Sequence, residues 1–275
     1  MGFLSLLAAE AKSPVWGIFV PGQAGAFIAV LIFAILVYVM INRARAGQAV
    51  REIHKIAGLE ALEEAVGRAT EMGRPVHYTM GLPGITDPQT IASFPVLGHV
   101  AKTCARYDTR LINTVPDVVV YAINEEIIRQ AYLEAGRPDA FNPDDVRFIT
   151  DWQFAYVAGV LEILAAEKPA AQILFGGPFF AEAMIFIEAG ALAGAIQVGG
   201  TASTSQLPFF VAGCDYALIG EEIYAASAYI SKEPILTGTV VGEDFYKFLL
   251  FAVIILGTLV ATFSSNNFLA TFLKS

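Results

Sequence analysis

The stretch QVGGTASTSQLPFF, residues 197–210, has the order of a strand, a turn and a helix. Its apolar start ends at Gly199 and Gly200, a run of hydroxyl residues follows, and Pro208 opens an apolar segment. Glycine supplies the backbone angles of a tight turn, and proline is favoured in the first turn of a helix. A second stretch, QILFGGPFF (172–180), repeats this plan without the inserted TASTSQL. The two copies predict successive strand–turn–helix units, and the insertion is the part that a packing turn does not require.

The same alternation extends over most of the chain. Short runs rich in β-branched and aromatic residues predict strands at 75–80, 109–115, 146–150, 171–175, 195–198 and 216–220. Helical patterns lie between and after them at 88–106, 116–136, 152–167, 178–193, 206–213 and 221–230. Strands separated by helices of this length indicate βαβ units. The predicted fold class is therefore α/β, with a mostly parallel, Rossmann-like sheet covered by helices.

Proline and small polar residues mark where the helices should begin. Pro88, Pro116 and Pro178 each follow a turn residue or a strand and are expected at the first helical position. Asn142, before Pro143, and Asp151 are expected to act as caps.

Composition adds a membrane to this picture. The 275 residues are 56% hydrophobic and 16% charged, and the mean hydropathy is +0.58. These values fit membrane segments joined to one globular domain. Residues 24–41 are free of charge, and residues 248–263 form a shorter apolar run. Two transmembrane helices, 16–42 and 245–264, are therefore predicted to flank the α/β domain.

The flanking charges predict an orientation. Arg43, Arg45, Arg51 and Lys55 follow the first apolar segment, whereas only Lys12 precedes it. The positive-inside rule then places the domain in the cytoplasm; the resemblance described below implies a prokaryotic inner membrane. The predicted division is an extracytoplasmic N-terminus (1–15), a juxtamembrane helical segment (43–72), a cytoplasmic α/β domain (73–240) and an extracytoplasmic tail (265–275). A cleaved signal peptide is the less favoured alternative, because residues 1–11 lack a positively charged start.

Charge and cysteine content exclude several classes of partner. The net charge of −9 argues against nucleic acid, whose phosphates require clustered Lys and Arg. Cys104 and Cys214 are far apart and have no metal-ligand spacing, so they are expected to be reduced, buried thiols. The three histidines share no spacing typical of a zinc site either. No cofactor and no metal are predicted.

Ligands of open parallel sheets bind where the carboxyl ends of strands meet helix N-termini. Here that edge is rich in glycine, hydroxyl and acidic residues; the candidate ligand-binding residues are Asp151, Gly176, Gly177, Gly199, Gly200, Thr201, Ser203, Ser205 and Glu221. It contains no Lys or Arg, and the chain has neither a P-loop nor a GxGxxG fingerprint. A small polar ligand held by backbone N–H groups is therefore a better expectation than a nucleotide.

An enzyme is a further alternative. His77 could act as a general base, oriented by Asp151 or Glu221, with Ser203 nearby. These groups would have to converge within hydrogen-bond reach. Because the chain has no nucleophile elbow, no catalytic residue is assigned.

Three longer segments resemble a known group of proteins. They are GRPVHYTMG (73–81), AYLEAGRPDAFNPDDVRFITDWQFAYVAGV (131–160) and QLPFFVAGCDYALIGEEIYAASAYIS (206–231). They are similar to an uncharacterised prokaryotic family of membrane-anchored domains of unknown function. The resemblance implies one domain over most of the region between the apolar segments and no particular activity.

Three function classes follow, in order of preference. The first is an assembly or scaffold component that is anchored in the lipid bilayer and forms a homo-oligomer, with other membrane proteins as further candidate partners. Pairs of small residues at Gly22–Ala26 and Gly257–Ala261 would permit close helix contact. The second is a module that senses a small metabolite at the strand ends. An enzyme is third, and a pore is disfavoured because neither apolar segment has an ionisable residue at its centre.

Overall fold

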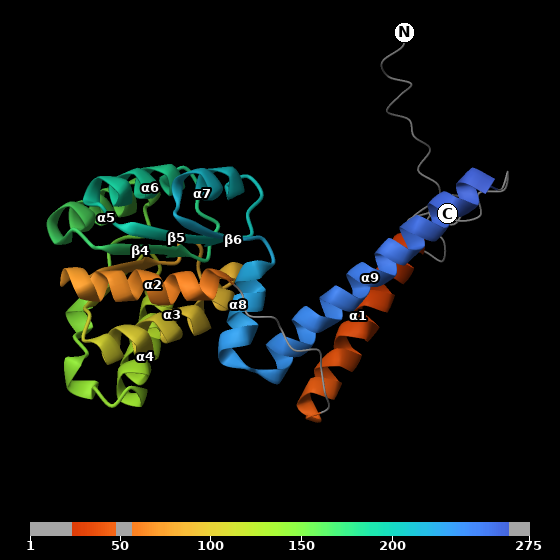
Figure 1. The fold of residues 1–275 in the computed structure, drawn as a ribbon, viewed down its shortest axis with the longest axis horizontal. Coiled ribbons are helices and arrows are strands. Elements are labelled where there is room, and N and C mark those ends of the chain that lie inside the picture. The colour runs from red at the N-terminus through yellow and green to blue at the C-terminus, as the bar shows by residue number, and fades with distance from the viewer. Residues whose placement is uncertain (1–23, 48–56, 264–275) are drawn as a thin grey trace, which may run out of the picture. The chain divides into compact units, whose positions relative to one another are not determined.

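The computed structural model describes residues 24–47 and 57–263, and the chain divides into two compact units (Figure 1). One unit is Ile53–Glu233. The other contains Met1–Glu52 and Pro234–Ser275. The predicted terminal segments 1–15 and 265–275 lie outside the described residues.

A six-stranded parallel sheet is the centre of the Ile53–Glu233 unit. Its strands are β1 (Val76–Thr79), β2 (Leu111–Val115), β3 (Val146–Phe148), β4 (Ala171–Phe175), β5 (Ile196–Thr201) and β6 (Tyr216–Ile219). They lie in the order β3-β2-β1-β4-β5-β6, and every neighbouring pair is parallel. This is the order of a doubly wound sheet. The first half of the chain adds β2 and β3 on one side of β1, and the second half adds β4, β5 and β6 on the other side. The predicted α/β class with a mostly parallel sheet is confirmed.

Helices cover both faces of the sheet (Figure 1). One face carries α2 (Ala57–Met72), α3 (Pro88–Tyr107), α4 (Val118–Glu134) and α8 (Glu222–Ser231). The other carries α5 (Gln153–Glu167), α6 (Glu182–Ala193) and α7 (Leu207–Gly213). Two short 3-10 helices, η1 (Pro138–Ala140) and η2 (Pro143–Asp145), connect α4 to β3.

Each face of the sheet has its own apolar core, because successive side chains of a strand point to opposite faces. Val76 and Tyr78 of β1 belong to the larger core, beneath α2, α3, α4 and α8. Leu174 of β4 packs with Phe186 and Phe210 in the smaller core, beneath α5, α6 and α7. The strands are buried on both sides, which explains why their sequences are apolar runs with few alternating charges.

The helix starts only partly follow the proline rule. α3 does begin at Pro88, and the Asp87 side chain accepts a hydrogen bond from the Gln89 amide. α4 instead begins after Asp117, whose side chain caps the helix by accepting from Val120 N. The expected starts at Pro116 and Pro178 are wrong for different reasons. At Pro116, the later residue Asp117 caps the helix, so α4 begins at Val118. At Pro178, the chain after β4 first makes a wide turn, so α6 begins only at Glu182. Asp151 is not a cap either, since the residue before α5 is Trp152.

The second unit contains two helices, α1 (Ala24–Arg45) and α9 (Pro234–Phe263), which pack antiparallel. Gly238 lies against the backbone of Ile41, and Gly242 lies against Val37. One turn further, the rings of Phe33 and Tyr246 are 5.0 Å apart. Gly238 and Gly242 form a GxxxG pattern, the arrangement that lets two helix backbones approach closely. The small pair predicted for the first apolar segment includes Gly22, which lies outside the described residues.

Within residues 24–47 and 57–263, one helix is long and apolar enough to cross a membrane, Phe27–Arg45. None of this stretch is buried in the structure, so it is not the core helix of a globular fold. The prediction of two such helices is not upheld. Glu243, Asp244 and Lys247 lie within α9, and the apolar part after Lys247 is shorter than the roughly 20 residues that a span needs.

Candidate functional site

The opening stretch of the sequence begins as a strand that is longer than expected. β5 continues through both glycines to Thr201. A Cβ atom at Gly199 would lie 2.2 Å from the Phe210 ring, and one at Gly200 would lie 2.5 Å from the Phe175 ring. Both glycines are therefore required for the sheet to contact these aromatic side chains. The expected turn at this position is wrong, because the close packing of the rings favours extended backbone.

The inserted hydroxyl segment is held by α3. Thr201 Oγ1 donates to Gln89 Oε1 at 3.3 Å, and the Ala202 amide donates to the same oxygen at 2.8 Å. The Ser203 amide donates to Thr201 Oγ1, and the Ser203 and Ser205 hydroxyls pair at 3.2 Å. The N–H groups that would have to hold an anion at Ala202 and Ser203 are thus already used inside the protein. The insertion has a structural role, which is to connect the end of β5 to the start of α3.

Replacing Gln89 with methionine is expected to loosen this segment without unfolding the domain. Methionine keeps the length of the side chain but removes the oxygen that accepts from Ala202 N. The loss of one such hydrogen bond is worth about 1 kcal/mol. Hydrogen exchange of the Ala202 amide should therefore accelerate several-fold, while amides at the centre of β4 keep their rates. Unchanged exchange at Ala202 would contradict the role given to Gln89.

At the carboxyl ends of β1, β4 and β5, where doubly wound sheets bind ligands, main-chain hydrogen bonds continue beyond the strands. Gly177 N donates to Met80 O at 2.9 Å, and Gly176 N donates to Gly200 O at 3.0 Å. Gly176 and Gly177 have φ angles of +133° and +126°, and a Cβ atom at Gly176 would lie 2.8 Å from Met80 O. A shallow space of about 400 Å³ remains above this contact, and we call it the carboxyl-edge groove. Its walls are mostly carbon and come from Leu82, Pro83, Gly84, Thr86, Asp87, Pro88, Pro178 and Phe180.

The residues considered for acid–base chemistry are not gathered in one place. His77 is fully buried, and its Nε2 lies 2.9 Å from Thr114 Oγ1. Burial, with a smaller contribution from the Arg147 charge, lowers the pKa of His77 to about 3. Asp151 and Glu221 are exposed on the connections that follow β3 and β6. His77 is thus a neutral residue of the core, and the structure does not bring it together with Asp151 or Glu221, which are exposed.

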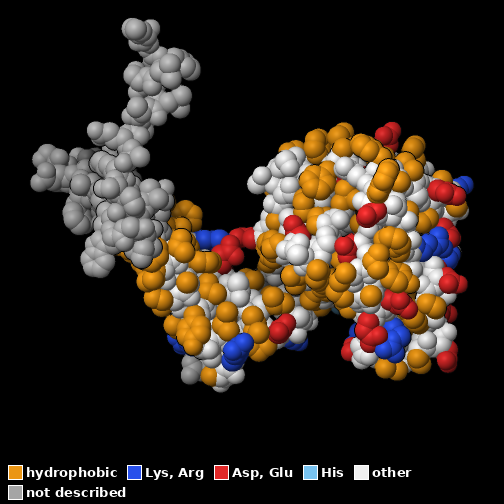
Figure 2. All heavy atoms as spheres, turned by 180° about the vertical axis from the view of Figure 1, so that it is seen from behind, with side chains coloured by type: hydrophobic (Ala, Val, Ile, Leu, Met, Phe, Trp, Pro, Cys, Tyr) orange, Lys and Arg blue, Asp and Glu red, His pale blue; other side chains and the backbone are white. Residues whose placement is uncertain are grey.

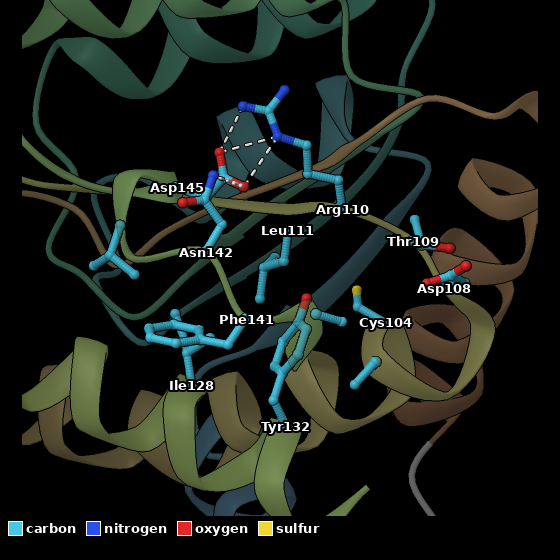
Figure 3. A pocket seen from close by; sticks show the side chains of 13 residues that line it. Cys104, Asp108, Thr109, Arg110, Leu111, Ile128, Tyr132, Phe141, Asn142 and Asp145 are labelled. Atoms are coloured by element: carbon cyan, nitrogen blue, oxygen red, sulfur yellow. Dashed lines mark hydrogen bonds and ion pairs between the residues drawn. The ribbon is translucent and has the colours of Figure 1, made fainter. Parts of the chain in front are cut away.

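A more enclosed cavity lies at the other edge of the sheet, where β2 and β3 begin (Figure 3). Its volume is about 270 Å³, and we call it the amino-edge pocket. Cys104 of α3, Leu111 of β2, Ile128 and Tyr132 of α4, and Phe141 provide most of its apolar wall. The rings of Tyr132 and Phe141 meet edge to face, with centroids 6.0 Å apart.

Four charged side chains form a closed cluster beside this pocket. Arg110 donates to Asp145 at 2.6 Å and to Glu167 at 2.8 Å, and Arg147 donates to Glu167 at 2.9 Å. The Asp145 side chain is only 10% exposed. The hydrogen bond to Asp145 is the main cause of a raised pKa of Arg110, and Arg147 is the main cause of a lowered pKa of Glu167. The cluster is neutral overall and joins the starts of β2 and β3 to the end of α5.

Sequence reasoning missed the amino-edge pocket. It predicted only a cap at Asn142, and the Asn142 side chain does accept from Asp144 N there. The available signal was the opposite charge of Arg110 and Asp145 just before two strands that turn out to be neighbours. Adjacent strands that start with opposite charges can pair at the edge of the sheet.

The α5–α6–α7 layer carries an unusual number of exposed apolar side chains. At or near the amino ends of these helices, Trp152 is 76% exposed, Phe154 74%, Phe180 52% and Met184 55%. Phe209 and Val211 of α7 are also exposed. We call these six residues the α5–α7 band. Figure 2 shows hydrophobic side chains over much of the visible face of this domain, the upper part included, where Figure 1 places these helices.

Comparison with known sequences gives one match. The sequence model of a protein family, described as a domain of unknown function (DUF6754), matches residues 15–272. No curated protein and no solved structure matches the chain. The match covers both units of the structure, from the first apolar helix to the second.

Proposed function

Since the chain belongs to this family of unknown function, its activity has to be argued from its own geometry, and we propose that it is a membrane-anchored assembly module. The Ile53–Glu233 unit would pair with a second copy of itself through the α5–α7 band. The observation that carries the proposal is the exposure of this band of apolar side chains.

The anchor in this proposal is the pair of helices α1 and α9. The outward side chains of α1 are large and apolar, among them Val30, Ile35 and Tyr38. Beyond Lys247, the outward residues of α9 are of the same kind, such as Phe251 and Ile254. Apolar side chains on the outside of a helix pair are what lipid requires. We therefore propose that α1 crosses the membrane of a prokaryotic cell with α9 packed against it, and that the domain lies on the cytoplasmic side, as Arg43 and Arg45 indicate.

The size of the band is appropriate for a specific contact between copies. A fully exposed aromatic side chain offers roughly 150–250 Å², so the band presents on the order of 600 Å². Each partner in a standard stable complex buries about 800 Å². The carboxyl-edge groove adjoins the band through Phe180 and adds further apolar surface.

Charge supports a second copy as the occupant of the band. The chain has a net charge of −9, so two copies repel each other except where their surfaces are uncharged. None of the six residues of the band is charged. Glu182, beside them, is buried and accepts from Gln153 Nε2 and from Phe180 N, and Asp151, next to Trp152, is an exposed charge at the edge of the band. In a two-fold interface the same surface of each copy meets its counterpart, and an uncharged apolar surface can contact itself in this way without repulsion. Anchoring in one membrane would also raise the effective concentration of the copies.

Trp152→Glu and Phe154→Glu are each expected to dissociate the assembly. A carboxylate at the centre of an apolar contact is desolvated without a partner, which costs several kcal/mol. The mass of the full chain in detergent, measured by light scattering after size exclusion, should fall from a multiple of the protomer to a single protomer.

Leu192→Glu is the matched control. Leu192 is 83% exposed and lies on α6, but at the opposite end of that helix. This variant should keep the mass of the wild type. A monomeric wild type would refute the proposal, as would a Trp152→Glu variant that stays assembled.

A further inference from the structure

The amino-edge pocket has the features of a binding site that is separate from the α5–α7 band. We infer that it takes a small neutral molecule with a flat, apolar body of one or two fused rings and one hydrogen-bonding group. Three observations support this inference: an unpartnered hydroxyl, a neutralised rim, and the size and shape of the cavity.

The hydroxyl belongs to Tyr132. The side chain is 6% exposed, and Figure 3 shows its hydroxyl among Leu111, Cys104 and the other side chains of the pocket. Within the described residues, this hydroxyl makes no hydrogen bond with the protein. It faces the open space of the cavity, so water or a ligand is the partner available to it. A ligand with a donor or an acceptor at this point would supply the missing partner.

The rim of the pocket has no spare charge for an ionised ligand. Arg110 and Asp145 neutralise each other, and Asp108 is paired with Arg137. The other polar wall groups are also engaged: Thr109 Oγ1 with Thr70 Oγ1, and the Asn142 side chain with Asp144 N. A charged ligand would enter this pocket without a counter-ion, so the chemistry favours a neutral one.

Size and shape restrict the ligand further. A cavity of 150 Å³ with apolar walls is enough to bind benzene, whereas drug-sized molecules occupy roughly 300–1,000 Å³. The amino-edge pocket, at about 270 Å³, lies between these limits. The edge-to-face rings of Tyr132 and Phe141 form part of its wall, and aromatic walls favour a flat guest.

The test uses 5-fluoroindole as a neutral bicyclic probe, titrated into the full chain in detergent and followed by fluorine NMR. Wild-type protein should bind it with a Kd below about 1 mM, the range of a fragment-sized ligand. Tyr132→Phe keeps the ring but removes the hydroxyl, so the Kd should rise by up to about tenfold, the effect of one hydrogen bond.

Two tryptophan substitutions separate this pocket from other places where the probe could dissolve. Ile128→Trp fills the pocket and should abolish binding, whereas Ile91→Trp, at an exposed position of α3 outside the pocket, should leave it unchanged. Thermal unfolding curves would confirm that each variant is folded. Binding that survives in Ile128→Trp would overturn the inference, and so would the absence of binding to the wild type. An unchanged Kd in Tyr132→Phe would overturn the role of the hydroxyl and with it the stated ligand class.

Discussion

Replacing Gly176 with alanine is expected to lower the free energy of unfolding of the Ile53–Glu233 unit by about 3 kcal/mol. The φ angle of Gly176 is +133°, a region that residues with a Cβ atom avoid. Such a conformation alone costs about 1–3 kcal/mol. The new Cβ atom would also lie 2.8 Å from Met80 O, a backbone atom that cannot move without disturbing the contact between β1 and β4. The two costs add because they arise from different atoms.

Gly136→Ala is the control for this experiment. Gly136 also has a positive φ angle, +75°, but a Cβ atom there would have no neighbour within 4 Å. Its substitution should cost about 1 kcal/mol, from backbone strain alone. Urea denaturation of the full chain, followed by far-ultraviolet circular dichroism, measures both variants. Equal losses for Gly176→Ala and Gly136→Ala would show that the Met80 contact does not matter.

The stability of the domain should fall by about 1.4 kcal/mol for each pH unit below about 6.5, and His77 should be the main cause. The folded-state pKa of His77, about 3, lies well below the value of 6.5 in the unfolded chain. The unfolded state therefore binds the proton first as the pH falls. The contribution of His77 is complete above pH 6.5 and is lost progressively between that value and pH 3. At pH 5 the loss amounts to about 2 kcal/mol.

His77→Gln tests this assignment because it removes the titrating group but keeps a side chain that can hydrogen-bond to Thr114. The unfolding free energy of this variant should depend less on pH between 6.5 and 5 than that of the wild type, by the roughly 2 kcal/mol assigned to His77. His99→Gln is the control. Burial also lowers the pKa of His99, but this side chain is partly exposed and lies near Glu63, which opposes the shift. A His77→Gln variant with the slope of the wild type would exclude His77 as the acid-sensitive group.

The sequence predicted the sheet well because the signal for a buried parallel strand is local. Short apolar runs bounded by glycine or proline identified the strands, and the helical lengths between them required parallel neighbours. The start of α6 was mispredicted because proline marks a helix start only when the preceding backbone permits it. After β4, the positive φ angles of Gly176 and Gly177 turn the chain away first.

The candidate sites were harder to predict because their contacts are distant in the sequence. Gln89 accepts hydrogen bonds from Thr201 and Ala202, which lie more than a hundred residues away in the sequence. The sequence of TASTSQL alone carries no sign of this contact, and it resembles a free loop. The amino-edge pocket combines α3, α4 and the start of two strands, and no single segment carries its pattern. The low pKa of His77 was not predictable from its neighbours in the chain either, because it results from burial by distant parts of the fold.

The antiparallel contact of α1 and α9 has a consequence for how the domain is retained. The chain enters the Ile53–Glu233 unit from α1 and leaves it into α9, so the unit is attached at both of its ends. Gly238 and Gly242 join these two attachments through direct helix contact. A single proteolytic cut on either side of the domain would therefore leave it tethered through the other helix. Release would require both connections to be severed, which makes the protein tolerant of one nick.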